Sequence, residues 1–100
     1  MTCYSVLDVT PTREDWISDY VGPANKLVAL HGGQYLARTS SHEQIEGEGS
    51  NPDLRIIIQW PSKQAALDFM KDPEYAPHFE ARTQGSISNH YLIEGKDEMA

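Results

Sequence analysis

Residues 54–62 read Leu-Arg-Ile-Ile-Ile-Gln-Trp-Pro-Ser, and this stretch decides how the rest of the chain can fold. Leu54 to Trp60 is rich in β-branched and aromatic residues, which predicts a β-strand, the most hydrophobic one in the chain. Its apolar side chains fall on both faces, as they do in a strand inside a sheet. Pro61 ends the strand and Ser62 is a typical helix N-cap, so we expect a central strand followed directly by a helix.

The chain after Ser62 predicts two helical segments and a final strand. Four apolar residues with helical spacing predict the buried face of the first segment: Ala65, Ala66, Phe69 and Met70. Asp72-Pro73 breaks this helix, because proline lacks the N–H that would continue it, and a second segment runs from about Pro73 to Arg82. Residues 87–94 (ISNHYLIE) predict the last strand, and the charged chain from Gly95 onward is expected to fray.

The chain before Leu54 predicts two further strands. Cys3 to Val9 (CYSVLDV) is the first, and Gln34 to Thr39 (QYLART) is the second. Residues 40–53 are polar and rich in Ser, Glu, Gly and Asn, which is typical of a connection. We therefore expect residues 40–53 to join the second strand to the central one as a hairpin.

A helix between the first two strands is predicted by apolar and aromatic positions three and four residues apart: Trp16, Tyr20, Ala24, Leu27 and Leu30 or His31. Thr12 is expected to be its N-cap, with Glu14 in the first turn, where a negative charge is favourable. Gly22-Pro23 is expected to kink or break the helix. Gly32-Gly33 is expected to end it, since glycine readily adopts the left-handed conformation.

The predicted order of elements is β-α-β-β-α-β, which indicates an α+β protein with the ferredoxin-like split βαβ arrangement. In this arrangement a four-stranded antiparallel sheet carries its helices on one face. The strands at 3–9, 54–60 and 87–94 have apolar residues on both faces, so the opposite face must also be covered. A second copy is the simplest cover, and we expect a homodimer. Residues 1–100 are expected to form a single domain with an ordered core from about 3 to 95.

The composition argues against several classes of partner. The 100 residues carry a net charge of −7 with only eight Lys and Arg, so we expect neither nucleic acid nor a membrane surface as a partner. The longest aliphatic run, Ile56-Ile57-Ile58, is far too short to span a membrane, and no secretory signal is visible. Cys3 is the only cysteine, so no intrachain disulfide is expected and a reducing cytoplasm is the expected location.

Several short motifs follow one another along the chain: Tyr4-Ser5-Val6-Leu7-Asp8-Val9, Tyr20-Val21-Gly22-Pro23, His31-Gly32-Gly33-Gln34-Tyr35-Leu36-Ala37-Arg38, Glu46-Gly47, Trp60-Pro61-Ser62 with Ala65-Ala66, Asp72-Pro73-Glu74-Tyr75, Arg82 and Glu94-Gly95. None is specific alone, but the ordered set resembles the DUF1330 family, small bacterial domains of the dimeric α/β-barrel superfamily. The resemblance implies a homodimer whose two sheets pack face to face. It implies little about function, because other members of the superfamily include cofactor-independent monooxygenases, haem-degrading enzymes and isomerases.

Three positions depart from the family pattern. Gln59 stands where an acidic residue is common, which removes one candidate carboxylate from any acid–base proposal. Phe69 stands where an aromatic residue, often Trp, is found, and Asp72 replaces a usual Ser.

Five residues are candidates for a functional site. His31 and Glu46 are the catalytic candidates, the first as a general base and the second as a proton acceptor. The alternatives are that His31 only places a cation at a helix C-terminus, and that Glu46 is a solvated charge or a salt-bridge partner of Arg82. Tyr75, Arg82 and Trp60 are candidate substrate-binding residues: a hydroxyl donor, an anchor for an anion and a pocket wall.

Neither a metal nor a cofactor is expected. The four histidines are dispersed without metal-ligand spacing, and the chain has neither a GxSxG motif nor a Gly-rich phosphate loop. One hypothesis is a small-molecule-binding protein or cofactor-independent enzyme, with its pocket between sheet and helices. The alternative is a non-catalytic dimeric module that senses a metabolite or supports another protein. The sequence does not decide whether the protein is an enzyme.

Overall fold

The strand predicted at residues 54–60, β3 (Leu54–Trp60), lies inside a four-stranded sheet in the computed structural model, which describes residues 1–100. β1 (Cys3–Pro11) pairs with one side of β3 and β2 (Gln34–Thr39) with the other. β4 (Ser86–Glu94) pairs with the free side of β1, so the strand order is β2-β3-β1-β4. All three pairings are antiparallel, which confirms both the predicted sheet and the central place of β3.

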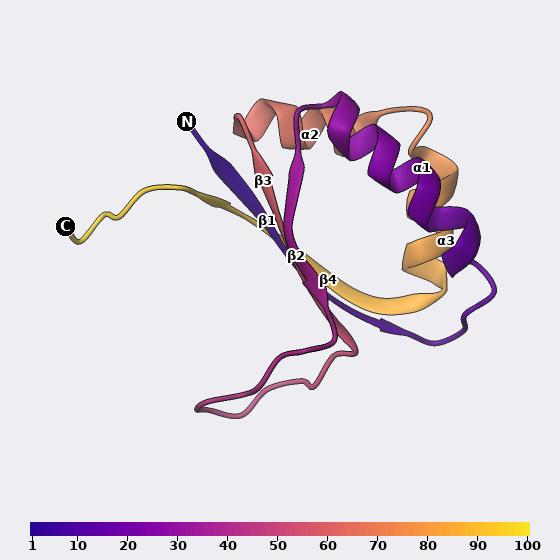
Figure 1. Cartoon of the computed structure of the whole chain (residues 1–100), viewed down its shortest axis with the longest axis horizontal. Coiled ribbons are helices and arrows are strands. Elements are labelled where there is room, and N and C mark those ends of the chain that lie inside the picture. Colours follow the sequence, from indigo (N-terminus) through magenta and orange to yellow (C-terminus); the bar gives the residue numbers. More distant parts are fainter.

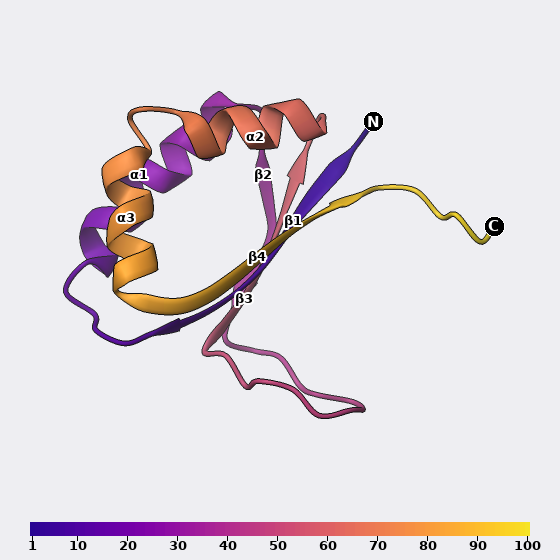
Figure 2. The same cartoon turned by 180° about the vertical axis from the view of Figure 1, so that it is seen from behind.

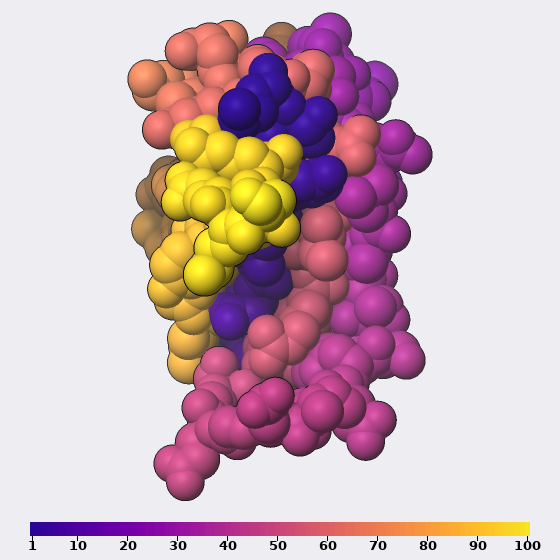
Figure 3. All heavy atoms as spheres, turned by 90° about the vertical axis from the view of Figure 1, so that its left-hand side faces the viewer, coloured from indigo at the N-terminus to yellow at the C-terminus, as the bar shows by residue number.

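Three helices cover one face of this sheet (Figures 1 and 2). They are α1 (Ile17–Leu30), α2 (Lys63–Lys71) and α3 (Ala76–Gln84). The predicted ferredoxin-like order is thereby confirmed, with the second helical region divided into α2 and α3. Figure 3 looks toward the opposite face, where the strands are open and the segment after β4 projects outward. None of the helices has the length and apolar character that a membrane crossing requires.

The strands turn alternate residues toward the helices. On β1, Cys3, Ser5, Leu7 and Val9 are buried, and the residues between them are partly exposed. This period of two is the normal geometry of a strand. The hydrophobic core is a single layer between sheet and helices, formed by Cys3, Leu7, Ala24, Leu27, Val28, Ile58, Trp60, Ala66, Phe69 and Tyr75.

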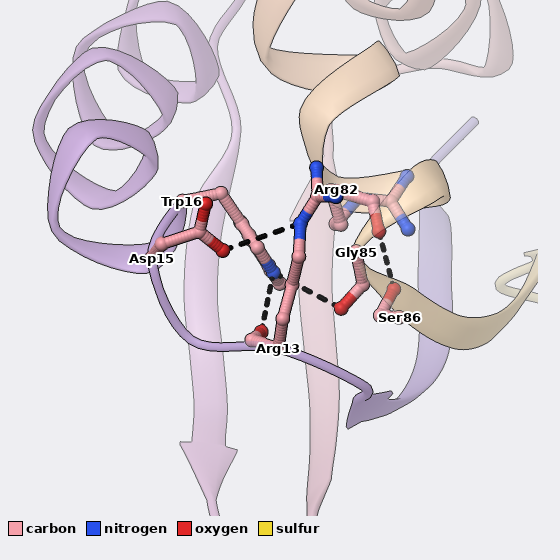
Figure 4. A network of polar contacts seen from close by, with 6 residues as sticks. All are labelled: Arg13, Asp15, Trp16, Arg82, Gly85 and Ser86. Atoms are coloured by element: carbon pink, nitrogen blue, oxygen red, sulfur yellow. Dashed lines mark hydrogen bonds and ion pairs between the residues drawn. The ribbon is translucent and has the colours of Figure 1, made fainter.

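The start of α1 differs from the prediction. Thr12 is not its N-cap: the helix begins at Ile17 after a turn, and the Thr12 backbone N–H donates to the Gly85 carbonyl (2.9 Å). The indole Nε1 of Trp16 donates to the carbonyls of Gly85 (3.0 Å) and Arg13 (2.8 Å) (Figure 4). These contacts with the start of β4 hold the chain in a turn, so tertiary hydrogen bonds override the local capping signal. A Cβ atom on residue 85 would collide with the Trp16 indole, which explains the glycine.

The expected break at Pro23 does not occur: α1 is continuous from Ile17 to Leu30, with Pro23 inside it. Proline removes one helical hydrogen bond. Ala24, Leu27 and Val28, all within five residues after Pro23, are buried in the core, and their packing holds the helix together. The predicted end is confirmed, since Gly32, which follows the C-cap residue His31, has a φ of +80°.

The remaining boundaries follow the predictions closely. The Ser62 hydroxyl accepts a hydrogen bond from the Ala65 backbone N–H (3.1 Å), which confirms the N-cap of α2. α3 begins at Ala76 rather than Pro73, because residues 72–75 form a turn in which the Tyr75 N–H donates to the Asp72 carbonyl (2.9 Å). Residues 40–53 form a long connection that projects beyond the sheet (Figure 1).

Candidate functional site

A cavity of about 90 Å³ lies between the inner face of the sheet and the helices. Eighteen residues line it, and 13 of them are hydrophobic. The apolar wall includes Leu7 and Val9 from β1, Ile56 from β3, Trp16 and Phe69. A volume of this size exceeds what one water molecule needs, so the cavity has room for a small organic group.

The Arg82 side chain enters this apolar cavity from α3. Arg82 is only 4% exposed, and its Nη1 donates to the Ser88 hydroxyl (2.8 Å). Its buried Nε has no hydrogen-bond partner, and none of the ion pairs of the chain includes Arg82. Burial lowers the pKa of Arg82, but the neighbouring Tyr75 and Tyr20 oxygens outweigh it and the net direction is upward. Arg82 is therefore a buried cation without a counterion.

Two tyrosines form a hydroxyl pair in the cavity wall. The Tyr20 oxygen from α1 and the Tyr75 oxygen from the residue before α3 lie 2.7 Å apart, so one hydroxyl donates to the other. Burial raises the pKa of Tyr20, which keeps this phenol neutral. The hydroxyl that accepts within the pair keeps its own proton available for a bound molecule.

A second polar group joins β1, β3 and β4. Trp60 Nε1 donates to the Ser5 hydroxyl oxygen (2.8 Å), and that oxygen lies 2.8 Å from His90 Nε2. Because an indole can only donate, the Ser5 proton is free to be donated to the imidazole. Burial, and secondarily the charge of Arg82, lowers the pKa of His90 to about 4. His90 is thus neutral at pH 7 and lines the cavity beside Ser5.

A bulge in β2 adds one aromatic and one cationic group to the wall. Tyr35 lies opposite Ile58 and Arg38 opposite Ile56, with a shift of register between Tyr35 and Ala37. Without this shift, two residues three positions apart would point to opposite faces. With it, both face the cavity, and the Arg38 guanidinium lies 3.9 Å from the centre of the Tyr35 ring. Arg38 Nη1 also donates to Asn25 Oδ1 on α1 (2.7 Å).

The five residues predicted from the sequence do not lie together. Tyr75 and Arg82 line the cavity. Trp60 is buried outside the lining and contacts two lining residues, Ser5 and Phe69. Glu46 lies in the exposed connection 40–53 and forms no ion pair with Arg82.

His31 also lies away from the cavity. Its Nε2 is 2.7 Å from Asp72 Oδ2 where α1 meets the turn between α2 and α3. This hydrogen bond lowers the pKa of the Asp72 carboxyl. The contact gives His31 a partner that joins two helical segments, which is the arrangement expected of a structural residue.

Five lining residues with polar groups were not among the sequence candidates, namely Ser5, Tyr20, Tyr35, Arg38 and His90. The alternation of inward- and outward-facing residues could have indicated Ser5 and His90. Ser5 shares the face of Leu7 and Val9 in β1, and His90 alternates with exposed residues in β4. Polar side chains on the inner face of a strand therefore mark this site better than the helix termini do.

The antiparallel sheet with helices on one face and a cavity between the layers defines an α+β protein with the ferredoxin-like fold. The chain belongs to the DUF1330 family, whose sequence model, described as a domain of unknown function, matches residues 2–96. None of the curated proteins compared with the chain matches it. No three His, Cys, Asp or Glu side chains form a group that could hold a metal ion.

Solved structures with the same fold share little sequence with the chain. The RPA0582 protein of unknown function from Rhodopseudomonas palustris has a TM-score of 0.75 at 15% identity, with 96% of this chain and 83% of that one covered. SnoaB, a cofactor-independent oxygenase from Streptomyces nogalater, has a TM-score of 0.66 at 17% identity, covering 98% and 96%. An antibiotic biosynthesis monooxygenase has a TM-score of 0.53 at 14% identity, covering 97% and 100%. At these identities the likeness concerns the fold.

Proposed function

We propose that this protein binds a small, mainly apolar organic molecule in the cavity between sheet and helices. The observation that carries the proposal is the coexistence of a mostly hydrophobic wall with a few converging polar groups, from Arg82, Tyr20, Tyr75 and His90. This composition is typical of small-molecule sites, in which apolar surface supplies affinity and polar groups fix orientation. A core built for stability alone would leave neither the space nor the unpartnered guanidinium nitrogen.

The test compares two phenylalanine substitutions on the same strand. Ile56→Phe fills the cavity, whereas Ile57→Phe adds the same volume to the outer face of β3. Indole, 1-naphthol and benzoate are offered at millimolar concentration, and binding is read from thermal shifts and from NMR chemical shifts. We expect at least one probe to bind the wild type and Ile57→Phe but not Ile56→Phe. Equal binding by both variants, or no binding by the wild type, would refute the proposal.

Catalysis without a cofactor is a second candidate, favoured by the neutral His90 in the cavity wall. The His90 imidazole accepts a hydrogen bond from the Ser5 hydroxyl. It can take up the Ser5 proton while the Ser5 oxygen receives one from an acidic bound molecule. SnoaB, which shares this fold, is described as a cofactor-independent oxygenase. If this protein turns over a small organic molecule such as the probe 1-naphthol with oxygen, the oxygen uptake measured with an oxygen electrode should be lost in His90→Gln. Uptake that is unchanged in His90→Gln would exclude this role.

We further propose that two copies pair through the open face of the sheet. Ile57, Val6 and Tyr91 lie side by side across β3, β1 and β4, and Ile57 and Tyr91 are 40% and 67% exposed. Ile93, one pair further along β4, is 51% exposed. Such a row of apolar side chains is uncommon on a monomer surface and suits a self-complementary interface. A single buried thiol, Cys3, is consistent with the reducing cytoplasm proposed as the location.

The dimer is tested by sedimentation at micromolar concentration. The wild type should sediment with twice the chain mass of 11.2 kDa. Tyr91→Lys places a charge in the centre of the proposed interface and should shift the mass toward one chain, whereas Gln64→Lys on the exposed side of α2 should not. A wild type that sediments as one chain would exclude the pairing.

A further inference from the structure

We infer that the ligand of this cavity is an organic carboxylate whose negative group is held by Arg82. The inference rests on the proposed function, because it names the chemical class of the molecule that the cavity takes. It starts from the unusual state of one side chain. Arg82 is 4% exposed, has only neutral groups around it, namely the Ser88 hydroxyl, the Tyr20 and Tyr75 hydroxyls and the Phe79 ring, and leaves its buried Nε–H without an acceptor.

A buried guanidinium normally lies against a carboxylate, since removing a charge from water is costly unless it is paired. Arg82 has no such partner within the chain. The carboxylate of Asp15, from the turn before α1, pairs with Arg13 instead (3.2 Å), as Figure 4 shows beside Arg82. The remaining ion pairs join His31 to Asp72 and Lys96 to the C-terminal acidic residues. The counterion of Arg82 must therefore come from outside the chain.

The charge distribution of the cavity points in the same direction. The chain has 15 Asp and Glu against eight Lys and Arg, yet none of the 18 lining residues is acidic. Two lining residues, Arg38 and Arg82, are cations. Although the protein as a whole is acidic, no negative side chain lines this cavity. A cationic ligand would find repulsion there, and an anion would find attraction.

The neutral polar groups of the wall also suit an anion. One hydroxyl of the Tyr20–Tyr75 pair retains a proton that it can donate. Arg82 itself offers Nε–H and the adjacent guanidinium N–H groups, and this edge matches the two oxygens of a carboxylate. The rest of the lining is apolar, so the body of the ligand is a hydrocarbon or an aromatic ring. These features together describe a small aromatic or aliphatic carboxylate.

The experiment compares molecules of one shape that differ in charge. Benzoate, benzamide and benzylamine are titrated into the wild type at pH 7 and low salt, with binding measured by calorimetry and NMR. We expect benzoate to bind at least tenfold more tightly than benzamide, and benzylamine more weakly than either. This comparison needs no variant, so it stands even if a substitution at position 82 impairs folding.

Variants then assign the effect to Arg82. Arg82→Met should lose the preference for benzoate over benzamide while the weaker binding of benzamide remains, and Arg82→Lys should retain part of the preference. Arg13→Met, which removes an exposed arginine near the same end of the sheet, should leave the preference unchanged.

The outcomes separate the two proposals. If benzamide binds as tightly as benzoate and Ile56→Phe blocks both, the cavity is a binding site but the carboxylate inference is wrong. If none of these three probes binds although indole or 1-naphthol does, the carboxylate inference fails and the proposed function stands; if indole and 1-naphthol also fail to bind, both fail. Preference for benzoate that persists in Arg82→Met would overturn the role of Arg82.

Discussion

Replacing Arg82 by methionine is predicted to stabilise the fold while it removes a binding group. The variant keeps an unbranched side chain of similar length in the apolar wall and removes the charge. Because the Ser86 hydroxyl bonds to the backbone carbonyl of Arg82, that contact with the start of β4 is unaffected. The substitution thus isolates the cost of burying an unpaired guanidinium.

The magnitude follows from the contacts that are lost and the cost that is relieved. The orphaned Nε–H costs about 1–3 kcal/mol, and more when the group is charged. The bond from Nη1 to the Ser88 hydroxyl contributes about 1.5–3 kcal/mol, but Ser88 is only partly buried and regains a water partner. Burial of the terminal methyl adds about 1 kcal/mol in favour of the variant. The net expectation is a gain of about 1 kcal/mol in the free energy of unfolding.

Urea denaturation followed by circular dichroism measures this change directly, and thermal unfolding provides a second reading. For a domain of this length, about 1 kcal/mol corresponds to a rise in Tm of about 4–8 °C. Arg13→Met, at an exposed arginine paired with Asp15, is the matched control and should change stability by less than about 0.5 kcal/mol. A loss of 1 kcal/mol or more in Arg82→Met would show that the charge of Arg82 is compensated in the folded state, and the reasoning would fail.

Three further predictions concern other contacts. Gly85→Ala should destabilise the protein by about 2–4 kcal/mol in urea denaturation, because the added Cβ displaces the Trp16 indole and its two hydrogen bonds; a loss under 1 kcal/mol would contradict this. Ser62→Ala should cost about 1 kcal/mol by removing the N-cap of α2, whereas Ser62→Asp should not. The folded-state pKa of His90, about 4, lies below the unfolded value of 6.5, so the unfolded chain binds more protons between these values and stability should fall as the pH is lowered from 6.5 toward 4. After allowance for its partial exposure this loss is about 1–2 kcal/mol, and a pH series of urea curves should show it reduced in His90→Gln; identical pH profiles would refute the assignment.

The parts of the fold that were predictable are those in which local pattern and tertiary packing agree. The run at β3 shows apolar residues on both faces, and this strand does lie inside the sheet. Ser62 caps a helix in the structure because nothing competes for its hydroxyl. Thr12 was misleading for the opposite reason, since its backbone N–H is taken by the Gly85 carbonyl, 73 residues along the chain. Contacts between residues so distant in sequence leave no local signal.

The candidate site was predictable only in part. Tyr75 and Arg82 were identified from the family motifs, and both line the cavity. Ser5 and His90 were visible as polar residues in alternating strands, but which face of a strand is buried depends on the register of the sheet. Whether a guanidinium such as Arg82 meets a carboxylate is a tertiary fact that sequence spacing cannot supply.

Because of the bulge in β2, which side chains of this strand face the cavity depends on the number of residues between them as well as on their identity. The two halves of this strand are out of phase: Tyr35 before the bulge and Arg38 after it share a face only because one extra residue stands between them. If Leu36 were paired within a regular ladder instead of bulged out, every later residue of β2 would move by one place and Arg38 would turn to the outer face of the sheet, whereas deleting Leu36 would remove the bulge and leave Arg38 opposite Ile56 on the inner face. The bulge therefore decides whether the positive charge of Arg38 lies at the cavity or on the open face of the sheet, with no residue changed.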